Sequence, residues 1–323
     1  MPSLTRRSLL ASLALSACGG GAAAQARVRL LLLSGAAGGV FNDYGPALAG
    51  LLGERAAIDV DVQQTGGSND NIRMLGRGEA DLGLVNMGPA WDAFEGRRPF
   101  EAEGPQKGLR ALFPMYETPF GLVALKSRGV ARLSDLGGRL VGVGPAGGPG
   151  EVFFRGLSKA LGIEARIATG SPNELARRVV DGEIDAFWFG AGLPVGAFVK
   201  VLDESDALVF GLTDAEVAAF RRAFAYFAPY EIPALTYKGQ EAPLKTAAVW
   251  NFVLCGERLP EDVAYAVTKA ALDGAAALRR TVPAASGTLA ANARSNEFLP
   301  FHPGAARYYR ERGIALPPAL APG

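Results

Sequence analysis

Residues 28–52 read VRLLLLSGAAGGVFNDYGPALAGLL. The apolar run 28–33 predicts a short strand, and the spacing of apolar residues from Val40 to Leu52 predicts a helix. The glycine-rich turn 34–39 joins the two. The same order of strand, glycine turn and helix recurs along the chain, which is typical of a parallel α/β fold.

Two cycles of strand and helix follow one another, so we predict an α/β fold with two similar lobes. Residues 213–222 have a clear helix start, with Thr213 as the N-cap and Glu216 three residues later. The other expected elements are strands 58–62, 81–85, 109–115, 120–125, 140–143, 165–169 and 184–189 and helices 69–78, 151–161, 173–181, 194–202, 260–280 and 303–312.

The composition is that of an ordinary folded protein with an excess of glycine. Of 323 residues, 49% are hydrophobic and 42 are glycine, whereas glycine averages about 7%. Lys and Arg number 33 and Asp and Glu number 32, so no overall positive field exists to hold nucleic acid.

Histidine and cysteine are too few to support most catalytic or metal sites. His302 is the single histidine of the sequence, which argues against histidine metal sites and Ser-His-Asp catalysis, and we expect it to be structural. Cys255 lies in the apolar run 249–255, which predicts a buried, inert thiol. We therefore expect no metal, no cofactor and no enzymatic activity.

The first 26 residues predict a secretory signal that is not part of the fold. Arg6 and Arg7 form a basic start, and the apolar stretch 8–17 is shorter than the about 20 residues that a membrane helix needs. The sequence TRRSLL at 5–10 is similar to a twin-arginine export signal, with a generic positive start as the alternative. We expect the mature protein in the periplasm.

The motif LSAC at 15–18 resembles the lipobox of bacterial lipoproteins, in which the cysteine is acylated after cleavage. Cys18 would then anchor the protein to the membrane through the glycine- and alanine-rich tether 19–24. The alternative is cleavage after Ala26, at a site of the A-x-A form. With Cys18 acylated, Cys255 has no partner for a disulfide.

Five glycine-containing junctions follow predicted strands directly: 34–39, 65–68, 85–89, 142–150 and 189–194. In an open α/β sheet the carboxyl ends of the strands share one edge, where ligands bind. Glycine allows the backbone to approach a ligand, and each following helix start offers free N–H groups and the positive end of a dipole. We therefore expect a ligand cleft lined by backbone amides; tight turns without a ligand are the alternative. None of the five junctions contains Lys or Arg.

Motifs along nearly all of residues 28–313 resemble the TAXI family, the solute-binding proteins of TRAP transporters. They are GGV at 38–40, TGGSNDNIRML at 65–75, GEADLGLV at 78–85, LSDLGGRLVGVGP at 133–145, DGEIDAFW at 181–188, AGLP at 191–194, IPA at 232–234, YKGQ at 237–240, LPEDV at 259–263 and LPFHPGA at 299–305. The resemblance implies a periplasmic-binding-protein-like fold of type II, whose two lobes close on a small solute in the cleft between them. In this family the solute is often a carboxylate such as glutamate or 2-oxoglutarate, and the partners are the membrane subunits of an ion-driven TRAP transporter.

The resemblance also implies the order of the domains. Residues 1–26 would form the signal peptide and lipoprotein tether, and 27–117 the first part of lobe I. Residues 118–236 would form lobe II, and 237–323 would return to lobe I and end in the C-terminal helices. We expect a monomer that binds no nucleic acid and contacts the membrane only through its lipid anchor.

The junctions and the resemblance together predict one set of ligand-binding residues. The set is Ser34, Gly39, Val40, Phe41, Asn42, Gly67, Ser68, Asn86, Met87, Gly147, Gly148, Gly150, Phe189, Gly190 and Ala191. The apolar part of the cleft wall would be formed by the side chains of Phe41, Met87, Trp188 and Phe189. A carboxylate would be held by N–H groups and helix dipoles, since no cation is at hand.

The chain departs from the family at several positions where its members carry hydroxyl or amide groups. FND stands at 41–43, NMG at 86–88, GGPG at 147–150 and glycine at 190. A cleft without these groups disfavours polar ligands, which would be desolvated without partners. We therefore expect a solute that is more apolar or less anionic than glutamate. Asp43 either favours the helix N-terminus electrostatically or pairs with an ammonium group or cation of the ligand.

Two other functions stay open at the level of the sequence. One is a ligand-presenting sensor or scavenger lipoprotein that is not coupled to transport. The other is an exported enzyme on the same fold, against which the lack of a nucleophile, acid–base or metal motif argues. A TRAP permease gene beside this one would favour the transport receptor, and a sensor kinase gene would favour the sensor.

Intact-mass spectrometry of the exported protein tests the lipobox prediction. We expect a mature chain that begins at Cys18 and carries acyl chains, and Cys18→Ala should release the protein from the membrane fraction. Cys255→Ala serves as the control and should leave the acyl mass in place. A mature N-terminus at Arg27 would contradict the lipoprotein prediction.

Overall fold

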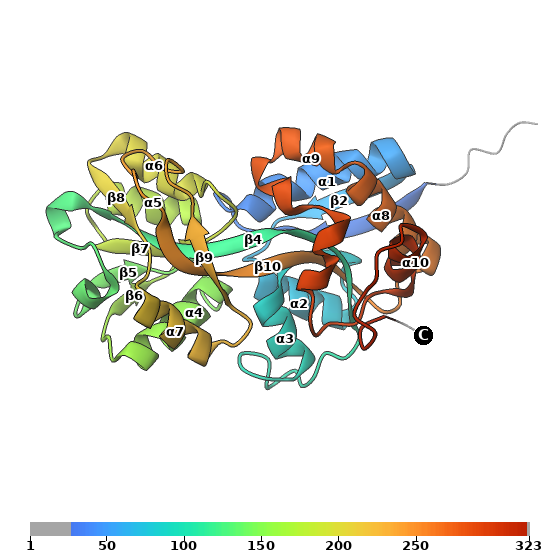
Figure 1. The fold of residues 1–323 in the computed structure, drawn as a ribbon, viewed down its shortest axis with the longest axis horizontal. Helices are drawn as coiled ribbons and strands as arrows, with labels where there is room; N and C mark the ends of the chain where they lie inside the picture. Colours follow the sequence, from blue (N-terminus) through green and yellow to red (C-terminus); the bar gives the residue numbers. More distant parts are fainter. Residues whose placement is uncertain (1–26, 322–323) are drawn as a thin grey trace, which may run out of the picture.

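The computed structural model describes residues 27–321, which form an α/β fold of two lobes (Figure 1). Lobe I contains β1 (Val28–Leu33), α1 (Val40–Ala56), β2 (Ile58–Gln63), α2 (Ser68–Arg77), β3 (Leu82–Asn86), α3 (Met87–Phe94), α8 (Glu261–Asp273), α9 (Ala275–Thr281) and α10 (Pro303–Glu311). Lobe II contains β5 (Leu140–Gly142), α4 (Pro149–Leu161), β6 (Arg166–Ala168), α5 (Pro172–Val180), β7 (Ala186–Gly190), α6 (Gly196–Glu204), β8 (Ala207–Phe210), α7 (Asp214–Ala223) and β9 (Ala228–Ile232). The signal-peptide, twin-arginine and Cys18 predictions concern residues 1–26 and lie outside the described residues.

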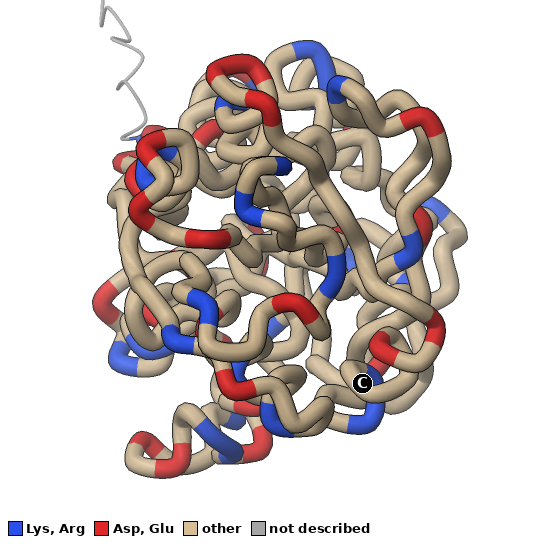
Figure 2. Tube along the Cα trace, turned by 90° about the vertical axis from the view of Figure 1, so that its left-hand side faces the viewer, with Lys and Arg blue, Asp and Glu red and all other residues tan. Residues whose placement is uncertain are grey.

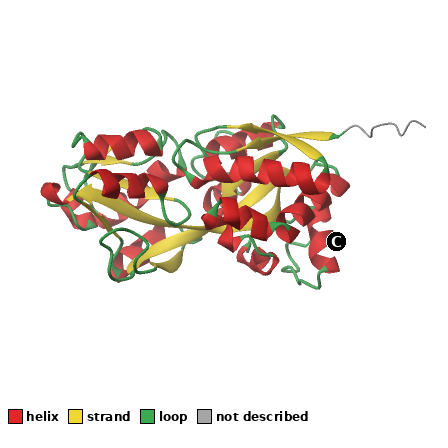
Figure 3. Cartoon of the chain, turned by 90° about the horizontal axis from the view of Figure 1, so that it is seen from above, coloured by secondary structure: helices red, strands yellow, loops and turns green. Residues whose placement is uncertain are grey.

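Two long strands, β4 (Leu109–Leu125) and β10 (Leu244–Gly256), run between the lobes, and we call them the crossing strands (Figures 1 and 3). They pair with each other in antiparallel register, from Leu109 opposite Gly256 to Pro119 opposite Ala248. The strand order is β2-β1-β3-β10-β4-β7-β5-β6, while β8 pairs with β4 and β9 with β10. The crossing strands therefore join the sheet of lobe I to that of lobe II.

The sheet is mixed, which corrects the expectation of a parallel architecture. The pairs β1–β2, β1–β3, β5–β6 and β5–β7 are parallel, as predicted, but β10 is antiparallel to β3 and β4 is antiparallel to β7. The predicted strands 109–115 and 120–125 are one strand of 17 residues. Pro114 and Pro119 lack an N–H donor, yet both lie within β4, and a register shift stands beside Pro114.

The C-terminal helix predicted over 260–280 is two helices, α8 and α9, which meet at Gly274. A Cβ at this position would lie 2.6 Å from the carbonyl oxygen of Ala270 and 2.9 Å from the side chain of Leu51. Gly274 therefore permits a close approach that the apolar pattern of the helices does not reveal.

One α-helix and three β-strands of the described residues are absent from the sequence-based prediction: α3, β8, β9 and β10. Gly88 and Pro89 indicate a turn, but Pro89 lies in the first turn of α3, where its missing N–H is harmless. The side chain of Asn86 caps this helix by accepting the Gly88 N–H. The apolar run 249–255 belongs to β10.

The hydrophobic core extends from lobe I along the crossing strands into lobe II. In lobe II it contains an aromatic cluster, in which the rings of Phe120 and Trp188 are stacked with centroids 5.2 Å apart. A second apolar cluster fills the space around α5 and α6. The strands of lobe II pack against these two clusters. This packing holds in place the lobe II side of the cleft that is described below.

The predictions for Cys255 and His302 are confirmed. Cys255 is fully buried in the core, and burial raises the pKa of its thiol, so the thiolate is disfavoured. His302 is the N-cap of α10, where its Nδ1 accepts the Gly304 N–H at 3.2 Å. Burial lowers the pKa of this imidazole.

Charged residues of both signs are interspersed over the lobe II end of the molecule (Figure 2). None of the helices within residues 27–321 is both long enough and apolar enough to cross a membrane.

Candidate ligand cleft

A cleft with an open mouth lies between the two lobes, over the crossing strands. Its empty space, including the open solvent at the mouth, amounts to about 620 Å³. All five glycine-containing junctions contribute to it, because each follows a strand whose carboxyl end faces the cleft. The lining consists of Gly35, Ala36, Gly39, Val40, Phe41, Gly66, Gly67, Ser68 and Asn86 from lobe I, Pro145, Pro149, Gly150, Pro172, Phe189, Gly190 and Ala191 from lobe II, and Tyr116, Thr118, Phe120 and Asn251 from the crossing strands.

Most of the predicted ligand-binding residues lie in this lining. They are Gly39, Val40, Phe41, Gly67, Ser68, Asn86, Gly150, Phe189, Gly190 and Ala191. The structure brings them together from two lobes, although they are spread over more than 150 positions of the sequence. Their contact with a solute stays a prediction.

Five predicted residues lie outside the lining and have structural roles. The hydroxyl of Ser34 donates to the carbonyl of Gln63, and Asn42 Oδ1 accepts from the side chain of Gln64. Met87 is buried in the core. Gly147 accepts a hydrogen bond from Asn69 at 2.6 Å, and Gly148 is the N-cap of α4. The glycine pattern marks the correct junctions but does not show which residue of each junction faces the cleft.

The crossing strands supply lining residues that the sequence reasoning missed. Tyr116, Thr118 and Phe120 alternate along β4, so their side chains share one face of the strand, and Asn251 lies on β10. No glycine marks this part of the cleft, so the junction argument could not find it. The period-two pattern of polar and aromatic residues in β4 is the signal that could have done so.

A hydrogen-bond network holds the polar side chains of the lining. Asn251 Nδ2 donates to the carbonyl of Tyr116 at 2.9 Å and to the hydroxyl of Thr118 at 2.6 Å. Asn251 Oδ1 accepts from the side chain of Asn86 at 3.4 Å, and the hydroxyl of Ser68 accepts the Asn86 N–H at 2.9 Å. The network ties the start of α3 to both crossing strands, so these polar groups are oriented before any solute arrives.

The hydroxyl of Tyr116 differs from these groups, because it forms no hydrogen bond with any described residue. The ring lies between those of Phe41 and Tyr44, with centroids 6.3 and 6.1 Å away. Burial raises the pKa of Tyr116 well above its ordinary value, and the charge of Asp43 adds to this effect. The phenol therefore stays protonated and can donate a hydrogen bond.

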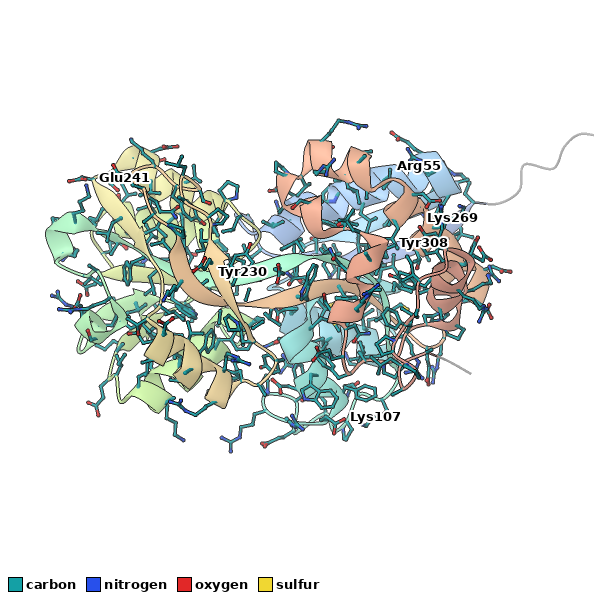
Figure 4. All side chains as sticks on the ribbon, viewed as in Figure 1. Arg55, Lys107, Tyr230, Glu241, Lys269 and Tyr308 are labelled. Atoms are coloured by element: carbon teal, nitrogen blue, oxygen red, sulfur yellow. The ribbon has the colours of Figure 1, made fainter. Side chains whose placement is uncertain are left out.

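Within residues 27–321 the lining contains no Asp, Glu, Lys, Arg or His side chain. Figure 4 shows Arg55, Lys107 and Lys269 at the outer margin of lobe I and Glu241 at the outer margin of lobe II. Asp43 is exposed in the first turn of α1 and outside the lining, and both interpretations of its role stay predictions.

Three helices begin at the cleft behind glycines, which carry no capping side chain. They are α1 after Gly39, α2 after Gly67 and α4 after Gly148. Their first-turn N–H groups have no acceptor within the helix, and each helix directs the positive end of its dipole to its start. Each of these helices also carries an acidic residue in its first turn, namely Asp43, Asp70 and Glu151, which offsets part of the positive potential there.

A sequence profile of the NMT1-like family matches residues 32–313. The chain belongs to the NMT1-like family. The match includes both lobes, the crossing strands and every residue that lines the cleft.

Solved structures at low sequence identity share the fold of this NMT1-like protein. The periplasmic binding protein BugD is 13% identical with a TM-score of 0.57, and the match covers 90% of this chain and 99% of BugD. MatC from Rhodopseudomonas palustris, determined with malate bound, is 14% identical with a TM-score of 0.56, over 81% of this chain and 90% of MatC. The GluR0 ligand-binding core, in complex with L-glutamate, is 10% identical with a TM-score of 0.51, and the match covers 80% of this chain and 99% of the GluR0 core. The predicted type II periplasmic-binding-protein fold is confirmed.

The lobes of this NMT1-like protein contact each other beside the cleft through two hydrogen bonds. Asn69 of α2 donates its side-chain N–H to the carbonyl of Gly147 at 2.6 Å. The hydroxyl of Tyr226, in the segment after α7, donates to the Asp92 carboxylate of α3 at 2.9 Å. These bonds stabilise the arrangement of the lobes in which the cleft is formed.

Glycines at the cleft permit close approaches that no hydroxyl-bearing residue would allow. A Cβ at Gly150 would lie 2.5 Å from the carbonyl oxygen of Val143, and one at Gly148 would lie 2.9 Å from that of Pro145. A Cβ at Gly190 would lie 2.6 Å from the ring of Phe120. The hydroxyls expected from the family are therefore not simply missing, because the backbone and the Phe120 ring occupy the space that their side chains would need.

Gly150→Ala tests this close approach. We expect the substitution to lower the free energy of unfolding by about 1–3 kcal/mol, because the Val143 carbonyl is held by backbone and cannot move aside. Gly137→Ala is the matched control, since Gly137 is exposed with φ of −53° and has open space around it. Urea unfolding at pH 7 measures both variants. Equal stabilities of the two would show that the junction relaxes around the added methyl group.

The Asp92 carboxyl predicts a pH dependence of stability. Burial raises the pKa of Asp92 to about 6, against the ordinary 3.8, while the hydrogen bond from Tyr226 and the charge of Arg97 oppose the shift. The folded state thus binds the proton more tightly than the unfolded state. The resulting stability is fully present below about pH 3.8 and is lost as the pH rises through about 6.

Comparison with Asp92→Asn, which stays neutral, isolates this contribution. We expect the unfolding free energy of the wild type to fall relative to the variant by up to about 3 kcal/mol between pH 4 and pH 7. In Tyr226→Phe the fall should move to higher pH, because the phenol no longer stabilises the carboxylate. Urea unfolding at each pH gives the values, and a difference that is independent of pH would disprove the assignment.

Proposed function

We propose that this NMT1-like protein is an extracytoplasmic solute receptor that captures a small organic solute between its lobes and delivers it to a TRAP-type membrane permease. The observation that carries the proposal is the convergence of five glycine-containing junctions, from both lobes, on one cleft without charged side chains in the described residues. Such a cleft suits binding by backbone amides and by oriented polar groups.

Capture would occur by closure of the lobes. The crossing strands are the sheet connection between lobes I and II, and each lobe supplies part of the lining. A solute that contacts both lobes favours the closed state by the difference in its interactions with the closed and open states. The hydrogen bonds Asn69–Gly147 and Tyr226–Asp92 would add to the stability of that state.

Delivery to a TRAP permease is supported by the TAXI-like motifs, which lie throughout the matched region. The signal-like residues 1–26 support a location outside the cytoplasmic membrane, with a lipid anchor at Cys18. MatC and the GluR0 core hold malate and L-glutamate, respectively, and these support only the class of a small organic solute for this chain. The missing hydroxyls at the junctions favour a solute less polar than glutamate. We propose that the receptor acts as a monomer.

Native mass spectrometry with small-angle scattering tests solute capture. We expect the purified mature protein to carry a small organic molecule, and its radius of gyration to increase when that molecule is removed. Ala36→Trp should abolish capture, because Ala36 lines the cleft and an indole there would fill it. Ala37→Trp is the matched control, since the neighbouring Ala37 lies outside the lining. Carriage of the solute by Ala36→Trp would contradict binding in this cleft.

Reconstitution tests delivery. In proteoliposomes that contain a TRAP permease from the same organism, uptake of the captured solute should require this protein and an ion gradient, and no ATP. Uptake that depends on ATP through another importer would contradict the TRAP assignment. Capture without any uptake would instead favour the ligand-presenting sensor or scavenger.

A further inference from the structure

The cleft offers no charged side chain to a solute within the described residues. A buried ammonium group needs an acidic partner, and a buried carboxylate needs a cation or several hydrogen-bond donors. The lining therefore disfavours zwitterionic amino acids, whose ammonium group would have no carboxylate partner. It can hold an anion only through N–H and O–H donors.

The polar side chains of the lining are confined to one side of the cleft. Ser68 and Asn86 belong to lobe I, and the remaining polar side chains belong to the crossing strands. Lobe II contributes three prolines, Phe189, Ala191 and two glycines, so its side chains are all apolar. A solute that fills this cleft is therefore complementary when it has one polar end and one apolar end.

One carboxylate has a defined place at the start of α1. Val40 and Phe41 lie in its first turn and line the cleft, and their N–H groups have no acceptor within the helix. At α2 and α4, in contrast, the acidic side chains Asp70 and Glu151 already accept the N–H groups of Gly66 and Gly147. Asp43 in the first turn of α1 offsets part of the positive potential there, but it accepts none of the N–H groups of that turn in the described residues, so those of Val40 and Phe41 stay available to a solute.

Tyr116 is a second and independent feature at the same place. Its side chain lines the cleft beside Phe41, and the residue is only 4% exposed. Its protonated hydroxyl has no partner among the described residues and is not one of the fully buried unpaired atoms, so it is open to the cleft and free to donate. An acceptor on the solute would satisfy it.

We infer that the solute is an amphipathic monocarboxylate, with its carboxylate at the start of α1 and the Tyr116 hydroxyl and its apolar body against Phe189 and the prolines of lobe II. This inference rests on the proposed function and names the solute class of that same cleft. A second carboxylate would meet the apolar side chains of lobe II, and an ammonium group would find no carboxylate partner among the described lining residues.

Isothermal titration calorimetry on the mature protein, freed of its carried solute, tests the class with four matched probes. They are 4-methylpentanoate, its neutral amide 4-methylpentanamide, leucine and glutarate. We expect 4-methylpentanoate to bind at least about tenfold more tightly than each of the others. The amide lacks the charge, leucine adds an ammonium group and glutarate adds a second carboxylate.

Two tyrosine variants test the placement of the carboxylate. Tyr116→Phe should lower the affinity for 4-methylpentanoate by about tenfold, which is the effect of one lost hydrogen bond to a charged group. The ratio of the affinities for 4-methylpentanoate and for its amide should also decrease. Tyr44→Phe is the matched control, because the Tyr44 hydroxyl is buried outside the lining and bonded to Thr288 at 2.8 Å. It should lower stability without changing the affinity.

The outcomes separate this inference from the proposed function. The inference is overturned if leucine or glutarate binds more tightly than 4-methylpentanoate. It is also overturned if neither 4-methylpentanoate nor longer or aromatic monocarboxylates bind. The proposed function still holds in that case if native mass spectrometry finds another solute in the cleft. A protein that carries no solute and binds no probe contradicts both. Wild-type affinity in Tyr116→Phe overturns the position of the carboxylate.

Discussion

The antiparallel pairing of β4 with β10 is the interaction on which the rest of the structure depends. β10 also pairs with β3 of lobe I and β9 of lobe II, whereas β4 pairs with β7 and β8 of lobe II. Backbone hydrogen bonds therefore connect the two lobes, and breaking them would leave buried polar groups unpaired at a cost greater than their net contribution. Motion of the lobes must therefore bend these strands and not separate them.

The cleft is polar on the side of lobe I and apolar on the side of lobe II, and the contacts of the crossing strands explain this difference. Asn251 fixes the backbone of Tyr116 and the hydroxyl of Thr118, which places polar groups toward lobe I. Two residues farther along β4, Phe120 packs on Trp188 in the aromatic cluster of lobe II. The lining surface of β4 thus changes from polar at Thr118 to apolar at Phe120. Both side chains lie on the face that lines the cleft, because side chains alternate along a strand.

The sequence predicted the α/β units and the general position of the site, because both depend on local signals. Short apolar strands followed by glycine junctions and periodic helices identify βα units, and such junctions lie at the carboxyl ends of the strands. It did not predict β10 or the continuity of β4, since their pairing joins residues more than 120 positions apart in the sequence. The sequence pattern also placed Ser34, Met87 and Phe41 together among the ligand-binding residues. In the structure Ser34 and Met87 are buried in lobe I, and only Phe41 lines the cleft.

By itself, the sequence determined the βα units, the five junctions and the absence of Lys and Arg from them, because each of these is a property of a contiguous segment. Only the tertiary structure decided which residue of each junction faces the cleft and that Tyr116, Thr118 and Asn251 complete it. It also decided that glycine at 150 and 190 is required by the Val143 carbonyl and the Phe120 ring. The physical reason is close packing: these distances are set by segments far apart in the chain, and no local pattern records them.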